Sequence, residues 1–397
     1  MTTSRATTLF LAGTFLTSLS GHAWALDGQD LLKKINAAYA AGSATISAES
    51  VEVTGSDVLL KGAKFTTLGE NQSSVKLGDL TLKNVSEEDG GAYSIERIDF
   101  PPVNFTEEKS SVTVDDLYLA GVWVPASTEG NDLSSMMLYE EAHSGPVKVV
   151  VDGKEVFSMA EASGSLDVAD DEESMSFEAD ISGIKADLAS VEDAKSKEAI
   201  EALNLKTIDG EVTMKGSWEL ATGTIKVEEY AFDFANVGML NFAFSVSGYT
   251  MDLVKQLQET ARTMQSQPQN EQAQQAAGLA MLGLMQQMSF NNAKIRFEDD
   301  GITSRGLEYA GKQQGTSGAD MAQMVKAMVP IMLGQANLGA FANEVSAAVN
   351  TYIDDPNSLT ISATPEKPVP FPMIMGAAMG APDTLPKVLG AKVTAND

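Results

Sequence analysis

The stretch YAFDFANVGMLNFAFSVSG, residues 230–248, carries the pattern that decides the fold. Large apolar residues stand two positions apart on both sides of a short break that contains a glycine. A spacing of two is the period of a β-strand, so each run directs its large side chains to one face. The pattern predicts a hairpin in which Phe232 lies opposite Phe244, and Phe234 lies opposite Phe242. The sequence leaves open whether this apolar face covers a closed core or an apolar ligand.

The same alternation recurs before this hairpin. From residue 42 onward, alternating runs follow one another at a spacing of roughly 12 to 16 residues, separated by Gly, Asn, Asp and Ser, which is typical of consecutive antiparallel strands. Asp152-Gly153 lies between two such runs and predicts a tight hairpin turn. Helices are predicted over 27–41, where Leu31 begins an apolar stripe, and over 190–205.

The pattern changes after residue 250. We expect helices over 250–265 and 279–288, a hairpin over 289–310 that turns at Asp300-Gly301, one or two helices over 317–353 with Pro330 as a kink or boundary, and a strand over 358–364. The fold class predicted is α+β. It is mainly an extended, curved, antiparallel sheet with helices packed on it, and it becomes helix-rich towards the C-terminus.

Domain boundaries follow from the same pattern. Because strands recur after residue 250, residues 26–397 are predicted to form one elongated domain. A boundary near residue 250, with 250–397 as a helix-rich part, is the alternative.

The first 25 residues resemble an export signal. Arg5 precedes a short apolar run, Leu9–Leu16, which is too short to span a bilayer, and the small residues of Ala23–Ala25 fit a cleavage site. The mature chain is therefore predicted to begin at Leu26 and to contain no transmembrane segment. We expect a periplasmic location, with secretion as the alternative.

Charge and composition argue against several function classes. The predicted mature chain has 26 basic and 55 acidic residues, a balance that disfavours nucleic acid and anionic lipid surfaces as partners. No nucleotide-binding loop is recognisable, and no cofactor is expected. We therefore do not expect an enzyme, although the many acidic residues leave a carboxylate-based hydrolase as an alternative.

The residues that bind transition metals are scarce. The chain has no Cys, and His143 is the one His of the predicted mature chain. A tight site for zinc would need mostly carboxylates, which is uncommon, so no metal site is predicted. We interpret His143 as a solvated loop residue, and a weak metal site with Glu140 and Glu141 is the alternative.

Methionines form three clusters in the last third of the chain. Two follow helical spacing and one is short; their members are Met281, Met285 and Met288, then Met321, Met324, Met328 and Met332, and then Met373, Met375 and Met379. Met is flexible and is over-used at surfaces that adapt to varied apolar partners. One interpretation is that these helices close over the apolar sheet face with a lipid between. An ordinary core is the first alternative, and copper bound through Met321/Met324 and Met373/Met375 is the second.

The segment GEVTMKGSWELATGTIKVEEYAFDFANVGMLNFAFSVSG, residues 210–248, and the tail that begins SLTISATPEKPVPFPMIM resemble a known group of proteins. They are similar to the long antiparallel sheets of AsmA-like and YdgA-like bacterial envelope proteins. The resemblance covers roughly the chain from residue 200 onward. It implies a periplasmic protein whose curved sheet holds acyl chains on its concave face and serves envelope or lipid homeostasis. It assigns no site residues.

The function predicted is that of a non-catalytic periplasmic protein that holds a lipid or another apolar ligand. The alternative is a structural envelope protein with a closed core and a protein partner. The candidate ligand-binding residues are Phe232, Phe234, Phe242 and Phe244 on the sheet, and Met281, Met285, Met288, Met321, Met324, Met328 and Met332 on the helices.

Overall fold

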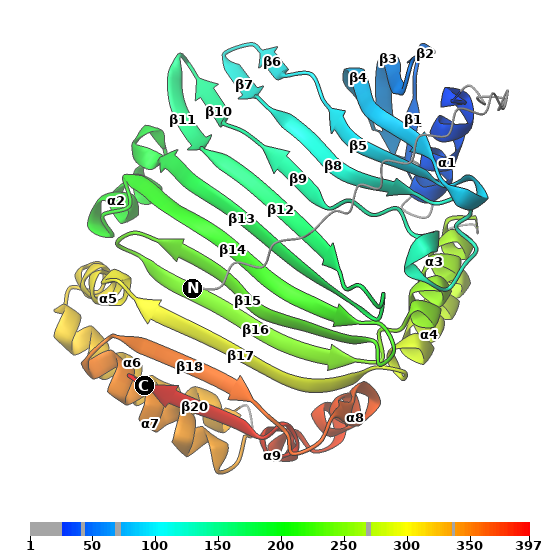
Figure 1. The fold of residues 1–397 in the computed structure, drawn as a ribbon. Helices are drawn as coiled ribbons and strands as arrows, with labels where there is room; N and C mark the ends of the chain where they lie inside the picture. The colour runs from blue at the N-terminus through cyan, green and yellow to red at the C-terminus, as the bar shows by residue number, and fades with distance from the viewer. Residues whose placement is uncertain (1–25, 41–43, 68–72, 267–270, 336–337) are drawn as a thin grey trace, which may run out of the picture.

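The computed structural model describes residues 26–40, 44–67, 73–266, 271–335 and 338–397; the predicted signal, residues 1–25, lies outside them. The described residues form twenty strands and nine α-helices. All strands belong to one large antiparallel sheet that is open and curved (Figure 1). The predicted α+β fold class is therefore confirmed.

The strands, in chain order, are β1 (Ala44–Ser47), β2 (Ser50–Thr54), β3 (Asp57–Thr67), β4 (Ser74–Glu87), β5 (Tyr93–Asp99), β6 (Val103–Glu107), β7 (Ser110–Val114), β8 (Leu117–Val124), β9 (Glu141–Ser144), β10 (Val147–Val151), β11 (Lys154–Met159), β12 (Glu161–Val168), β13 (Ser174–Asp187), β14 (Thr207–Glu219), β15 (Thr224–Phe234), β16 (Gly238–Ser247), β17 (Ser289–Asp299), β18 (Ser358–Ala363), β19 (Val369–Pro370) and β20 (Ala391–Ala395). The helices are α1 (Gly28–Ala40), α2 (Ala194–Ala202), α3 (Met251–Ser266), α4 (Glu271–Met285), α5 (Ile302–Gln313), α6 (Gly318–Gln335), α7 (Phe341–Asp354), α8 (Phe371–Gly380) and α9 (Leu385–Leu389).

The sheet is a meander in which each long strand pairs with the next one along the chain. Some strands are interrupted, so that their two halves pair with the two halves of the neighbour: β5 pairs with β8 while β6 pairs with β7, and β9 pairs with β8 while β10 pairs with β7. The interruptions fall at Pro101-Pro102, at Asp115-Asp116 and at Gly145-Pro146. Proline has no N–H to donate to a neighbouring strand, which explains breaks at two of these positions.

The two faces of the sheet differ in chemistry along the whole register. One row of directly paired residues across β14 to β18 is apolar: Val212, Phe232, Leu240, Phe297 and Leu359. The adjacent row points to the other face and is mostly polar: Thr213, Ala231, Asn241, Arg296 and Thr360. Because side chains alternate between faces along a strand, this pattern gives one apolar face and one polar face.

Helix α1 closes the first part of the apolar face. Leu31 and Ile35 pack against Leu60, Leu82 and neighbouring residues of β3, β4, β5 and β8 in the main buried cluster of the described chain. The Asp27 side chain caps the helix by accepting from the main-chain N–H of the residues two and three positions later, both at 3.0 Å. This region is the hydrophobic core that the fold needs for stability.

The other helices lie around the rim of the sheet (Figure 1). Helices α3, α4 and α8 stand at one end of the strands, and α5, α6 and α7 lie at the end of β17 and beyond β20. The Glu344 side chain of α7 accepts a hydrogen bond of 3.1 Å from the main-chain N–H of Val393 in β20. Helix α7 therefore protects the edge of the last strand, which would otherwise expose unpaired backbone groups.

The predicted register of the opening hairpin is wrong. Phe232 pairs with Leu240 and Phe234 with Gly238, while Phe244 lies opposite Val227. The chain turns immediately after Phe234, through Asn236, whose φ is 61°. An irregularity in β15 between Val227 and Ala231 then shifts the register of the remaining pairs. The large side chains still share one face, as their spacing predicts.

Other predictions after residue 250 need correction. Residues 302–313 form helix α5, so the predicted hairpin over 289–310 is only its first strand, β17. The Asp299 side chain accepts from the N–H of Gly301 at 2.7 Å and of Thr303 at 3.0 Å, which satisfies the backbone where the helix begins. Pro330 is not a helix boundary, because α6 runs through it. Strand β20 has no counterpart among the predicted elements.

Candidate functional site

A large part of the apolar face lies open beyond the region that α1 covers. We call its centre the open patch: Tyr230, Phe232, Phe242, Phe244, Ile295 and Ile361. The exposed fractions are 37% for Tyr230, 38% for Phe244, 39% for Ile295 and 46% for Ile361, and the other two side chains are half-buried. Large apolar side chains gathered on one open surface usually mark an interaction site.

The aromatic rings of the open patch hold one another in place. The ring centroids of Tyr230 and Phe232 lie 4.6 Å apart, and Phe232 meets Phe242 edge to face at 6.3 Å. Such pairs stabilise the rings beyond their simple burial. The patch is therefore a preformed apolar surface that needs little reordering when a ligand binds.

Phe234 has a different role from the other predicted phenylalanines. It lies near the turn of the hairpin, and its ring packs so closely over Gly210 that a Cβ added there would come within 2.4 Å of it. Phe234 therefore fills a gap between strand ends and lies beside the open patch.

The predicted methionines lie on rim helices, except Met288, which lies in the turn before β17. Met321 is buried, whereas Met324, Met328 and Met332 are exposed on α6, with 62% exposure at Met332. On α4, Met281 is exposed and Met285 is half-buried, whereas Met288 is half-buried in the turn between α4 and β17. Figure 1 places α4 at the strand ends and α6 beyond the last strand, so these helices flank the open face and do not close over it.

Sequence reasoning missed Leu240, Ile295 and Ile361, which neighbour the predicted phenylalanines across the strands. Ile295 lies opposite Phe242, and Ile361 lies opposite Ile295. Ile295 and Ile361 each stand in a short run of alternating apolar and polar residues, so the sequence did contain the strand pattern for both. Only the order of the strands brings the three runs together.

The open patch and the closed cluster share one continuous face. A single row of paired residues leads from one to the other: Leu82, Ile98, Leu119, Ala142, Gly164, Ala179, Met214 and Tyr230. In the middle of this row stand the small residues Ala142, Gly164 and Ala179, so few side-chain atoms rise above the backbone between the two bulky regions. An extended apolar chain laid across the strands would meet no polar side chain along this row.

His143 does not lie in a loop, so its interpretation as a solvated loop residue is wrong. It belongs to β9, with 15% of the side chain exposed, and lies 3.4 Å from Asp116 and 3.6 Å from Glu161. The imidazole ring of His143 stacks on the ring of Tyr118, with their centres 4.7 Å apart. The Arg97 guanidinium lies 3.5 Å from the centre of the Tyr118 ring. This cluster is on the polar face. Within the described ranges, no group of three or more His or acidic residues is arranged to hold a metal ion.

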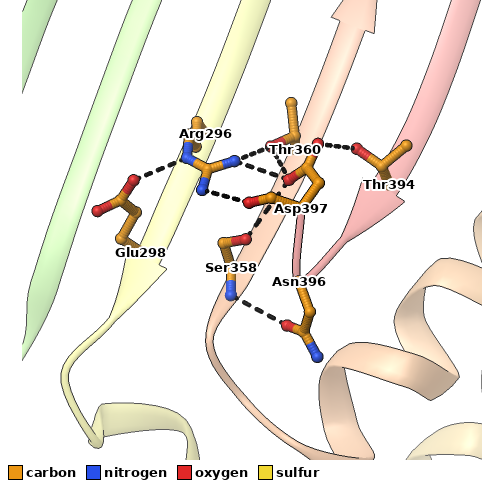
Figure 2. A network of polar contacts seen from close by, with 7 residues as sticks. All are labelled: Arg296, Glu298, Ser358, Thr360, Thr394, Asn396 and Asp397. Atoms are coloured by element: carbon orange, nitrogen blue, oxygen red, sulfur yellow. Dashed lines mark hydrogen bonds and ion pairs between the residues drawn. The ribbon is translucent and has the colours of Figure 1, made fainter.

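The polar face carries a second cluster, around Arg296 (Figure 2). The guanidinium donates to Glu298 at 2.8 Å, to Thr360 at 2.9 Å, and to the side chain and main-chain oxygen of Asp397 at 2.7 and 2.9 Å. Hydrogen bonds from Thr394 and Arg296 lower the pKa of Asp397 to about 2. Because four of the five N–H groups of the guanidinium donate to protein groups, the cluster ties the last residues to β17 and β18.

Residues 231–396 match the model of a family described only as an uncharacterized protein, and this match begins within β15 and includes most of the open patch. No curated protein matches the chain. Among the helices that the structure describes, none has the length and apolar character needed to cross a bilayer.

Proposed function

We propose that the protein holds an acyl chain of a lipid on the open apolar face of its sheet, without catalysing a reaction. The observation that carries the proposal is the open patch, with Phe244 and Ile361 more than a third exposed on a preformed surface. Neither the packing of α1 nor the rim helices explains why this surface is apolar. A bound apolar molecule would remove it from water.

The geometry also suggests the kind of lipid. A chain of about 14 methylenes lying on an open face buries roughly half of its surface, which is worth about 5–6 kcal/mol before the cost of ordering. That corresponds to a dissociation constant of about 0.1 mM or weaker. A lipid with two acyl chains is therefore the expected ligand, because a second chain along the same face adds a similar gain.

The location follows from the predicted signal and from the resemblance to envelope proteins. We propose export to the periplasm and a role in envelope or lipid homeostasis. In that compartment, lipids are available for an open apolar sheet to bind. N-terminal sequencing of protein from a periplasmic extract is expected to begin at Leu26. Recovery with residues 1–25 still attached would contradict export by cleavage.

Native mass spectrometry of gently purified protein tests the lipid proposal directly. We expect a co-purifying mass in the range of a phospholipid, and its loss in Phe244→Asp. Ala243→Asp is the matched control, because it adds the same charge one residue away on the polar face, opposite Lys294. A wild-type protein that is consistently free of lipid and takes up no fluorescent lipid probe would overturn the proposal. A stable complex with an envelope protein would then favour the alternative.

A further inference from the structure

A separate cavity of about 280 Å³ lies between α1, β8, the segment 128–139 and α3. Leu119 of the apolar face lines it, together with Met136, Met137, Met251 and Val254. The cavity is five strand spacings from β15, or about 24 Å along the sheet. It is therefore distinct from the open patch, and a ligand bound in it is independent of the proposed function.

The cavity combines apolar walls with several polar side chains and a single charged group. Of its thirteen lining residues, Lys255 alone is charged, in a chain with 55 acidic and 27 basic residues. Lys255 donates one hydrogen bond, of 3.1 Å, to the main-chain oxygen of Glu129. An ammonium group has three donors, so two remain for another acceptor.

Two tyrosines, Tyr39 and Tyr139, line the same cavity as Lys255. Burial, with a smaller contribution from Tyr139, raises the pKa of Tyr39, so its hydroxyl keeps its proton. A cavity that combines one cation, two hydroxyl donors and apolar walls suits an anion that carries an apolar tail.

We propose that this cavity binds a single-chain amphiphile with an anionic head, of the fatty-acid class. The carboxylate accepts from Lys255 and from the tyrosine hydroxyls, and the tail lies between the methionines and Leu119. The volume of about 280 Å³ lies just below the usual range for ligand sites, about 300–1,000 Å³, so the cavity admits one medium chain and excludes a two-chain phospholipid.

The test compares three ligands with the same tail, added to the full mature chain below their micellar concentrations: dodecanoate, dodecanol and dodecyltrimethylammonium. Isothermal titration calorimetry measures each affinity. We expect saturable binding of one dodecanoate, with the cationic ligand weaker by about tenfold or more, because the ammonium of Lys255 repels it. Equal affinities for the three ligands, or no saturable binding of dodecanoate, would overturn the proposal.

Three variants assign the binding to this cavity. Lys255→Met is expected to weaken dodecanoate by about tenfold and dodecanol by less than about twofold. Lys197→Met, on the exposed surface of α2, removes the same charge and should leave both affinities unchanged. Phe244→Asp should leave the difference in affinity between dodecanoate and dodecanol unchanged, because that difference depends on Lys255 and not on the open patch. An unaltered dodecanoate affinity in Lys255→Met would contradict the inference, and since Lys255 is not a core residue the variant is expected to fold.

Discussion

The two ends of one apolar face differ in how far they are buried. Near β3 to β8, the side chains of the face are sealed beneath α1, and Leu82 is 1% exposed. Near β15 to β18, on the same face and in a continuous row of paired residues, Phe244 is 38% exposed. The strands alternate in the same way in both regions. The difference therefore arises from the cover, because α1 brings an apolar stripe to one region, whereas the open patch in the other region stays exposed.

The two ends of the apolar face also have different roles: one contributes to stability and the other offers a surface for binding. Burial beneath α1 removes apolar area from water within the protein itself, so that end contributes to the free energy of unfolding. The open end retains apolar contact area that a ligand can bury. Substitutions of comparable chemistry are therefore expected to change stability at one end and ligand binding at the other.

The largest expected effect is in the closed region. Leu82→Ala removes a fully buried side chain beneath α1 and leaves a cavity, which should lower the free energy of unfolding by about 2–5 kcal/mol. Urea unfolding followed by circular dichroism measures this change. Val75→Ala in the same strand is the control, since Val75 is 54% exposed and should change stability by about 0.5 kcal/mol or less. Similar losses for the two variants would contradict a sealed core at this end.

The second effect concerns the polar contacts of Asp30, which we call the tether because they join α1 to β5. Asp30 forms an ion pair with Lys34 and accepts a hydrogen bond of 3.0 Å from the Tyr93 hydroxyl of β5. The hydrogen bond from Lys34 lowers the pKa of Asp30 below its ordinary value of 3.8, despite an opposing effect of burial. A depressed pKa means that the folded state favours the carboxylate. This stabilisation is present above about pH 4 and is lost as the pH falls through the folded pKa.

We therefore expect Asp30→Asn to lower the free energy of unfolding by about 1 kcal/mol at pH 7, a value reduced for partial exposure. The difference from wild type should shrink below pH 4. Asp167→Asn on β12 makes the same charge change at an exposed position and serves as the control. A difference that grows towards acid pH would show that the tether does not act through the ionised carboxylate.

How far the sequence predicts these two regions depends on the range of the forces involved. Strand periodicity is local, and it correctly indicated the sheet and the apolar face around Phe232. The register depends on where the chain turns, and the left-handed residue Asn236 shifted it away from the predicted pairs. Helix α5 was missed because its start depends on the Asp299 side chain, whose acidic turn resembled a hairpin tip. Which part of the face α1 covers is set by tertiary packing, and no local pattern contains that information.

The third effect is in the open region. Phe244→Ala should lower the free energy of unfolding by only about 0.5–1 kcal/mol, because cross-strand contacts are lost but no sealed cavity forms. The affinity for a fluorescent phospholipid should fall several-fold under the proposed function. Urea unfolding and probe titration on the same samples give both values. A loss of stability as large as that of Leu82→Ala would show that Phe244 belongs to a closed core and would remove the contrast between the two regions.

The smallest effect lies at the far edge of the open region, on the polar face. Asp397 joins β20 to Arg296 and has a pKa of about 2, so its ionised form stabilises the fold above about pH 4, and this contribution is lost between about pH 4 and pH 2. Since 47% of the Asp397 side chain is exposed, Asp397→Asn should cost about 0.5 kcal/mol or less at pH 7. Asp383→Asn, at an exposed position that precedes α9, is the matched control. Urea unfolding at pH 7 and at pH 2 should show the difference from wild type only at the higher pH. If lipid binding also falls in Asp397→Asn while stability is unchanged, the edge of the sheet takes part in holding the ligand, and the open region extends further than the patch around Phe244.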